Sequence, residues 1–385
     1  MRSTSYIELS RSALKKNIQY LQKRIGHDVQ FVSVIKGNAY GHGIKQFVPL
    51  AEECHVNYFA VFDATEAREV YKVKQESSHL MVMGMISGPD LKWAIKNNIS
   101  FFVFNVERLQ EAAFYAAELN TPARIHIEVE TGLHRTGFEE SELENVVRFL
   151  KKHPMLFFIE GICTHYAGAE SIANYYRIQQ QIKQFLKIKQ WFLQKGITPK
   201  YYHSACSSAA LNYPETCMDL VRFGIAHYGF WPNTETKMHN LLSDDTTLTK
   251  DPLHQILSWK SKIMDVKIVL PGEFIGYGTF YQTTKKTMIA TLPIGYYHGY
   301  HRSLSNLGHV LVHGKKAKVI GLINMSVMII DVTPIPQVKA GDEVVLIGKQ
   351  GKHKISVASF SEISNLVNYE LLVRLPQSTP HIITE

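Results

Sequence analysis

The sequence predicts an N-terminal (β/α)8 barrel of the TIM type, followed by a C-terminal antiparallel β domain. The first two thirds of the chain alternate eight short apolar runs with amphipathic segments, and the last third is β-rich. Eight strands joined by helical crossovers are the count of this barrel, and continuous Val, Ile and Phe runs are typical of strands covered on both faces. The pattern alone leaves a doubly wound open sheet as the structural alternative.

The expected elements begin with a helix over residues 10–25, for which Ser10 is a suitable N-cap. Further helices are expected over residues 106–119, after Asn105, and over residues 173–194. The eight strands are expected in the segments VQFVSVIK, NYFAVFD, HLMVMGM, ISFFVFN, RIHIEVE, LFFIEGICTH, YYHSACS and MDLVRFGIAHYG.

The character of the chain changes after about residue 240. Residues 240–252 are polar and predict a linker, so the barrel is expected over residues 1–240 and the β domain over residues 241–385. Turn signals divide the β domain at Pro271-Gly272, His313-Gly314 and Ala340-Gly341.

Composition and charge predict a cytoplasmic protein that binds neither nucleic acid nor membrane. The net charge of +8 comes from basic residues spread among acidic ones, without a basic tail, which indicates a solvated basic surface. Such a mildly basic field would also suit an anionic cofactor or substrate. The chain has no run of about 18 apolar residues, no apolar signal segment at its N-terminus, and no CxxC pair among its four cysteines.

Lys36 is the first candidate for chemistry, because it closes the first barrel strand in the stretch FVSVIKGNAYGHG. The carboxyl ends of barrel strands form the floor of the active site. A lysine with a desolvated amine loses proton affinity and becomes a nucleophile for an aldehyde, and the glycines after it let backbone approach a ligand. The alternative is a lysine that extends from the barrel rim to solvent.

The ends of the later strands carry compatible groups, namely Arg135, His165, Ser207, Arg222 and Gly224. Two cations, an imidazole, a hydroxyl and a backbone turn suit a phosphorylated aromatic cofactor. A metal site is not expected, because a cluster of carboxylate and histidine ligands is missing.

Six motifs resemble those of alanine racemases, in the same order. VIKGNAYGHG is similar to the family's lysine motif for pyridoxal 5'-phosphate (PLP), and the later ones are VETGLHRTG, THYAGAE, VRFGIAHYG, PIGYYHGYHR and LVNYELLVRLP. The resemblance spans nearly the whole chain and implies the same architecture of a barrel and a β domain.

The resemblance implies two catalytic bases, Lys36 and Tyr296, one on each face of the substrate Cα. It implies that Arg222 faces the pyridine nitrogen, that His165 packs along the ring, and that Arg135 lies near the cofactor and the substrate carboxylate. The residues matched to the phosphate site are Tyr40, Ser207, Gly224, Ile225 and Tyr369. Met325 matches a backbone contact to the substrate from a second subunit, and the family implies a homodimer with shared active sites.

The sequence departs from the family pattern at several positions. Glu128 stands where a lysine, carbamylated in many members, precedes the arginine by seven residues, and we expect its charge to pair with Arg135. Other departures are Cys206, Ser326, His298 and Gln377.

We therefore expect a PLP-dependent amino-acid racemase, with alanine as the substrate and D-alanine for peptidoglycan as the product. A racemase of serine, lysine or another amino acid remains the nearest alternative. A decarboxylase of the same fold usually has a CxSCD-like motif, which this chain lacks. Non-catalytic PLP-binding proteins are single barrels without a β domain.

Overall fold

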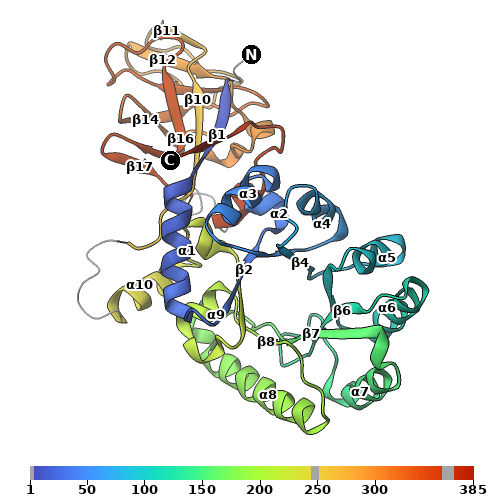
Figure 1. Ribbon diagram of the computed structural model, residues 1–385. Coiled ribbons are helices and arrows are strands. Elements are labelled where there is room, and N and C mark those ends of the chain that lie inside the picture. The colour runs from blue at the N-terminus through green and yellow to red at the C-terminus, as the bar shows by residue number, and fades with distance from the viewer. Residues whose placement is uncertain (1–3, 244–250, 358–367) are drawn as a thin grey trace. The chain divides into compact units, whose positions relative to one another are not determined.

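The computed structural model (Figure 1) describes residues 4–243, 251–357 and 368–385. The chain forms two compact units. The barrel unit consists of Ala13–Lys36 and Val48–His254, and the sheet unit consists of Met1–Ser12, Gly37–Phe47 and Gln255–Glu385. These units differ from the two continuous ranges expected from the sequence, because an N-terminal segment and the segment after Lys36 both belong to the sheet unit.

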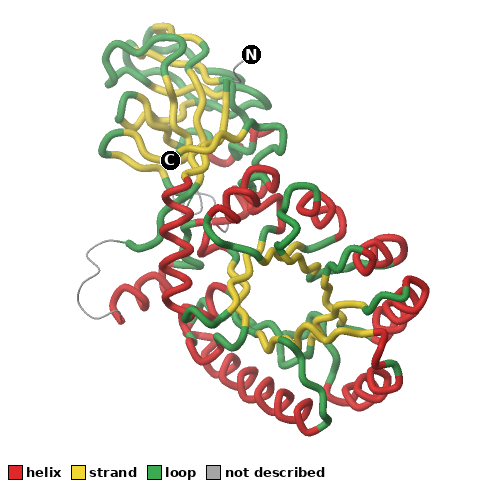
Figure 2. Tube along the Cα trace, in the orientation of Figure 1, coloured by secondary structure: helices red, strands yellow, loops and turns green. Residues whose placement is uncertain are grey.

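All eight predicted barrel strands are present and parallel. Their order around the barrel is β8-β7-β6-β5-β4-β3-β2-β9. A bridge between Cys206 and Arg222 and a hydrogen bond from Arg222 N to Ala205 O (3.1 Å) close the ring between β8 and β9. Figure 2 shows the ring of strands with helices outside it. The strands are β2 (Gln30–Val34), β3 (Tyr58–Val61), β4 (His79–Val82), β5 (Ser100–Val103), β6 (Ala123–Glu128), β7 (Phe157–Cys163), β8 (Tyr201–His203) and β9 (Leu220–Phe223).

The helices agree with the predicted segments. Asn105 caps α6 by accepting a hydrogen bond from Arg108 N at 3.0 Å. The last helix of the barrel unit, α10, includes residues 240–243, so the segment predicted as a linker begins as helix. The next residues of that segment, 244–250, lie outside the described part of the chain. The helices are α1 (Arg11–Ile25), α3 (Ile44–Glu53), α4 (Ala64–Tyr71), α5 (Gly88–Lys96), α6 (Val106–Leu119), α7 (Leu143–Lys152), α8 (Tyr175–Gln194), α9 (Ser207–Asn212) and α10 (Thr234–Ser243).

The sheet unit is mostly antiparallel, with strand order β11-β12-β15-β14-β13-β16-β10-β1-β18 and β17 paired to β16. His313 and Gly314, at φ 48° and 72°, form the predicted turn between β13 and β14. The N-terminal strand β1 pairs with β10 antiparallel and with β18 parallel. The unit contains β1 (Ser5–Ser10), β10 (Leu257–Lys262), β11 (Asp265–Val269), β12 (Thr287–Leu292), β13 (His309–Val312), β14 (Lys315–Ile320), β15 (Met328–Asp331), β16 (Glu343–Gln350), β17 (His353–Ile355), β18 (His381–Thr384) and the helix α12 (Asn368–Val373).

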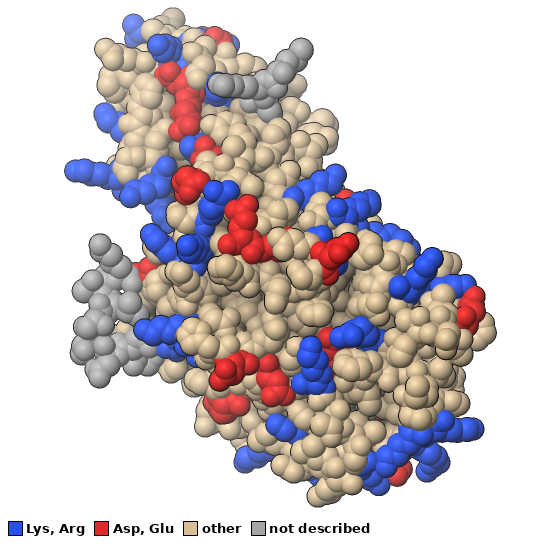
Figure 3. Space-filling view, in the orientation of Figure 1, with Lys and Arg blue, Asp and Glu red and all other residues tan. Residues whose placement is uncertain are grey.

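Acidic and basic side chains are interspersed over the face shown in Figure 3. This distribution fits the mixed charge pattern of the sequence. Within the described ranges, none of the helices has the length and apolar character needed to cross a membrane.

Candidate active site at the carboxyl ends of the barrel strands

Lys36 lies two residues beyond the end of β2, after Ile35, whose N donates a hydrogen bond to Ala60 O (2.8 Å). Its side chain keeps access to solvent, yet protein atoms surround it closely. Loss of hydration lowers the pKa of its ammonium, and the positive charge of Arg135 lowers it further. A lysine in this state has a larger fraction of neutral, nucleophilic amine than a surface lysine.

The chain turns sharply after Lys36 into the short element α2 (Lys36–Tyr40). Positive φ angles run through five consecutive residues, from Gly37 at 64° to Gly41 at 77°, so this turn is left-handed. Left-handed conformations cost about 1–2 kcal/mol for each non-glycine residue. Side-chain hydrogen bonds offset this cost: Asn38 Oδ1 accepts from Ile44 N at 3.0 Å, and His42 Nδ1 lies 3.0 Å from two carbonyl oxygens of the turn.

The left-handed turn also places Tyr40 beside Tyr369, and both residues were predicted to belong to the phosphate site. Within the sheet unit, the rings of Tyr40 and Tyr369 pack edge to face, with centroids 6.1 Å apart. Gly41 is necessary for this packing, because a Cβ atom there would collide with the Leu372 carbonyl of α12. The structure therefore brings together Tyr40 and Tyr369, which are far apart in the sequence.

Arg222 lies buried at the end of β9, where carbonyl groups hold its guanidinium. One nitrogen, Nη2, donates to Thr164 O at 2.8 Å and to Ser204 O at 3.1 Å. The other, Nη1, donates to Nδ1 of His203. These acceptors fix the guanidinium, and within the described part of the chain it forms no ion pair with a carboxylate.

His165 is held as a neutral imidazole. Burial lowers its pKa to about 3, with further contributions from Arg222, Arg135 and Lys36 in that order. The predicted site cations thus lie close enough to His165 to interact with it electrostatically, although a direct hydrogen bond between His165 and Arg222 does not form. At neutral pH the ring can donate through one nitrogen and accept through the other.

The expected ion pair between Glu128 and Arg135 is not formed. Glu128 is buried at the end of β6, and its carboxylate accepts a hydrogen bond from the Thr136 side chain instead. Burial raises the pKa of Glu128, while Thr136, Arg222 and Arg135 act in the opposite direction. The two residues influence each other through space, but the carboxylate does not fix the guanidinium's orientation by direct contact.

A residue that the sequence analysis missed, Glu130, organises the loop that carries Arg135. Its carboxylate accepts backbone hydrogen bonds from Gly132 N, from Leu133 N at 2.7 Å and from His134 N at 2.8 Å. Because His134 adopts a positive φ of 55°, the loop needs this anchor to keep its shape. Its place two residues after Glu128, within the motif VETGLHRTG, was the available signal.

Gln181, on helix α8, connects the Arg135 loop to the strand end that carries His165. Its amide nitrogen donates to Thr131 Oγ1 (3.3 Å) and to His165 O (3.2 Å), and its amide oxygen accepts from Ala167 N (2.8 Å). Gln181 is 1% exposed, so these groups have no access to water as a replacement. The helical pattern of the sequence placed this residue on α8 but gave no signal for its partners.

Ser207, Gly224 and Ile225 come together where the last two barrel strands end. Ser207 Oγ accepts hydrogen bonds from Gly224 N at 2.9 Å and from Ala226 N at 3.4 Å. His227 supports this loop from below, since its Nδ1 lies 2.6 Å from Gly224 O and its Nε2 lies 3.0 Å from Ser33 Oγ. The hydroxyl and backbone groups predicted to bind phosphate are thus adjacent.

Two further predicted residues, Tyr296 and Met325, lie beside each other in the sheet unit. Backbone hydrogen bonds join Tyr296 N to Asn324 O (3.0 Å) and Tyr297 N to Met325 O (3.0 Å). Gly295 permits this approach, because a Cβ atom there would collide with the carbonyls of both partner residues. Both Tyr296 and Met325 have exposed side chains.

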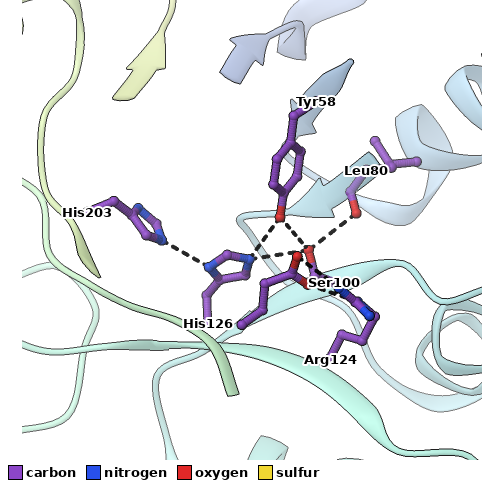
Figure 4. Close-up of polar contacts among 7 residues, drawn as sticks. Tyr58, Leu80, Ser100, Arg124, His126 and His203 are labelled. Carbon is purple, nitrogen blue, oxygen red and sulfur yellow. Dashed lines mark hydrogen bonds and ion pairs between the residues drawn. The ribbon is translucent and has the colours of Figure 1, made fainter. Parts of the chain in front are cut away.

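Buried polar side chains continue from His203 into the interior of the barrel (Figure 4). His203 Nε2 lies 2.9 Å from His126 Nδ1, and His126 Nε2 lies 3.1 Å from Tyr58 Oη. Tyr58 Oη contacts Ser100 Oγ at 3.1 Å, and Ser100 donates to Leu80 O at 3.3 Å. Both imidazoles are fully buried.

The comparisons with known proteins agree across both units. The family models for the N-terminal and C-terminal domains of alanine racemase match residues 9–232 and 256–383. The chain is 34% identical to the alanine racemase of Halothermothrix orenii, over 98% of this chain and 96% of that one. It is 30% identical to that of Leptospira interrogans, over 99% and 96% of the two chains.

Solved structures give the same result. The alanine racemase of Streptomyces lavendulae superimposes with a TM-score of 0.90 at 26% identity, covering 100% of this chain and 98% of that one. The Bacillus anthracis alanine racemase with bound L-Ala-P gives a TM-score of 0.89 at 29% identity, with 100% and 96% covered. With both domain models matched in order over most of its length, the chain belongs to the alanine racemase family.

Proposed function

We propose that this protein is a PLP-dependent racemase that interconverts L- and D-alanine. The observation that carries the proposal is the state of Lys36. Its amine lies at the carboxyl end of a barrel strand, and its pKa is lowered by loss of hydration and by the positive charge of Arg135. Membership of the alanine racemase family supports both the reaction and the substrate.

The donor groups of the chain fit PLP. The amine of Lys36 suits its aldehyde, and the guanidinium of Arg222, which can only donate, suits an unprotonated pyridine nitrogen. The Ser207 hydroxyl with the backbone groups of Gly224 and Ile225 suits a phosphate, and Tyr40 and Tyr369 add phenolic hydroxyls. When bound, PLP supplies an electron-withdrawing system that stabilises negative charge at the substrate Cα.

The residues of the chain would transfer protons at both faces of the substrate Cα: one group accepts a proton while the protonated group on the opposite face donates one. Racemisation removes the proton from one face of Cα and returns a proton to the other, so it needs a base on each side. We assign these roles to Lys36 Nζ and Tyr296 Oη. Arg135 would hold the substrate carboxylate by a charge-assisted hydrogen bond, and His165, neutral at working pH, would not compete for that carboxylate.

We further propose a cytoplasmic homodimer in which the sheet unit of one subunit supplies Tyr296 and Met325 to the barrel of the other. Large apolar side chains are exposed on the sheet unit, including Tyr277 (72%), Phe280 (62%) and Met325 (59%). Exposed apolar groups of this size are typical of surfaces that a partner covers.

Three measurements test the proposal. The purified protein should be yellow, and borohydride reduction followed by peptide mapping should place the cofactor on Lys36; a label on another lysine would contradict the assignment. Incubation with a panel of L-amino acids and chiral separation should give D-alanine fastest. A faster reaction with serine or lysine would establish the broader alternative.

The shared site has its own test. Lys36→Ala and Tyr296→Phe should each be inactive, and mixing them after dissociation should restore activity, because one site of a heterodimer then has both bases. Verified heterodimers without activity would show that both bases come from one chain. In the cell, the D-alanine that the native enzyme forms would serve peptidoglycan synthesis.

A further inference from the structure

The buried polar series beneath Arg222 has a donor at one end and an acceptor at the other. A guanidinium can only donate, and a backbone carbonyl can only accept. Arg222 Nη1 therefore donates to His203 Nδ1, and Ser100 Oγ donates to Leu80 O. The Arg222 end fixes the position of the proton on each of the two imidazoles between them.

The directions follow one from another. Since His203 Nδ1 accepts, its proton is on Nε2, which donates to His126 Nδ1 at 2.9 Å. His126 then carries its proton on Nε2, which donates to Tyr58 Oη at 3.1 Å and also lies 3.3 Å from Ser100 Oγ. Tyr58 passes its own hydrogen to Ser100 Oγ at 3.1 Å, because the hydrogen of Ser100 already points to Leu80.

The reverse arrangement fails at Arg222. If Tyr58 donated to His126 Nε2, His126 Nδ1 would donate to His203 Nε2, and His203 would carry its proton on Nδ1. That proton would face a guanidinium N–H, placing two hydrogens in a single contact. Protonation of His126 fails in the same way, because its Nδ1–H would again force the His203 proton onto Nδ1.

The surroundings favour the uncharged forms. Burial lowers the pKa of His126 to about 4, with Glu160 acting against this and Arg222 and Arg124 adding to it. Burial, then Arg222 and His126, hold the pKa of His203 well below its ordinary value. The ring of Phe102, with its centroid 5.7 Å and 6.0 Å from those of the two imidazoles, adds no charge.

The fold makes room for this pair of imidazoles. A Cβ atom on Gly161 of β7 would collide with His126 Nδ1 and would lie 2.8 Å from His203 Nε2. The register of β7 against β6 also shifts at this point, between Ile125 and His126, which leaves Glu160 to pair with Arg124. A glycine at the strand's centre is thus explained by the contact between the two histidines.

We infer that His203 and His126 are positioning residues that hold the Arg222 guanidinium, through a one-directional hydrogen-bond series that fixes both as uncharged Nε2–H tautomers. Because the series ends on a carbonyl, it transmits orientation and does not carry protons. The role of Arg222 toward a cofactor rests on the proposed function. The assignment of the two tautomers rests only on the hydrogen-bond geometry.

The tautomers can be tested on the unaltered holoenzyme by neutron diffraction from crystals exchanged into D2O. Deuterium should appear on Nε2 of both His126 and His203 and on neither Nδ1, at pH 6 and at pH 8. Deuterium on either Nδ1 would overturn the inference. This result stands or falls independently of whether the protein racemises alanine.

The positioning role is tested by His126→Asn, with His79→Asn as the matched control. His79 packs against Tyr58, with ring centroids 5.4 Å apart, but lies outside the series. In His126→Asn, kcat should fall roughly 10- to 100-fold, the range for displacing a group beside the reacting atoms by up to about 1 Å. KM for alanine should change less than kcat, and the absorbance maximum of bound PLP should shift.

The control variant should show neither change, and Tyr58→Phe, which removes one acceptor and keeps the ring, should show a smaller fall in kcat in the same direction. A soluble His126→Asn with unchanged kcat and spectrum would overturn the positioning role. If His126→Asn does not fold, Tyr58→Phe decides the matter in the same way, because unchanged kcat and spectrum in that variant contradict the series.

Discussion

Replacing Glu130 by glutamine should loosen the loop that carries Arg135 while leaving its shape and volume almost unchanged. The carboxylate accepts three backbone N–H groups, from Gly132, Leu133 and His134. In Glu130→Gln one oxygen becomes an NH2 group, which cannot accept, so either the bond from His134 N or the bonds from Gly132 N and Leu133 N are lost.

The cost follows from this geometry. A hydrogen bond to a charged group contributes about 1.5–3 kcal/mol, and each 1.4 kcal/mol corresponds to roughly a tenfold change in an equilibrium constant. His134 already sits in a left-handed conformation, which adds a tendency for the loop to relax. We expect kcat/KM for alanine to fall at least about tenfold, since Arg135 would hold the substrate less often in the productive orientation.

The assay is the initial rate of D-alanine formation by chiral separation, with PLP content measured in parallel. Glu142→Gln is the matched control, because its carboxylate accepts a single backbone N–H, from Glu139 at 2.8 Å, away from the Arg135 loop. The reasoning is refuted if Glu130→Gln retains the parent kcat/KM, or if the control loses as much.

Three other variants follow from the buried polar groups of the barrel unit. Glu128→Gln should raise Tm at pH 8, because burial raises the folded-state pKa of Glu128 and the native protein therefore loses stability as pH rises above the ordinary carboxyl pKa. The gain in Tm should disappear near pH 4, and an equal gain at both pH values would contradict this reasoning. Gln181→Leu leaves Ala167 N without its acceptor, so it should lower the free energy of unfolding in urea by about 1–3 kcal/mol and also lower kcat/KM. Gln190→Leu, on the exposed face of the same helix, should change the free energy of unfolding little. Arg124→Leu leaves Glu160, at 1% side-chain exposure, without its partner and should cost about 3–5 kcal/mol at pH 7. Because Arg124 overrides burial and keeps the Glu160 pKa low, that cost should shrink as pH falls through the acid range, and a loss independent of pH would argue against the pair.

Local signals in the sequence were enough for the elements of the barrel. Each strand is an apolar run short enough to cross the barrel once, and Asn105 marks the start of α6 because its side chain serves the helix's own backbone. The turn at His313-Gly314 was predictable for the same reason, since both residues tolerate positive φ.

Interactions between distant segments could not be predicted in this way. Strand periodicity places His126 and Glu128 on one face of β6, but only the fold shows that His126 meets His203 and that Glu128 turns to Thr136 rather than to Arg135. The membership of β1 in the sheet unit likewise depends on a partner, β10, that lies some 250 residues further along the chain.

That long separation has a consequence for synthesis. At roughly 5–20 residues per second, the ribosome needs on the order of 10–50 s to make the chain between β1 and β10. During this time Ile7 and Leu9, which are fully buried in the finished sheet, have no strand to pair with. An unpaired apolar strand is a site of aggregation. We therefore expect a gene fragment that ends near residue 240 to leave β1 without its partner β10 and to aggregate more than the full chain.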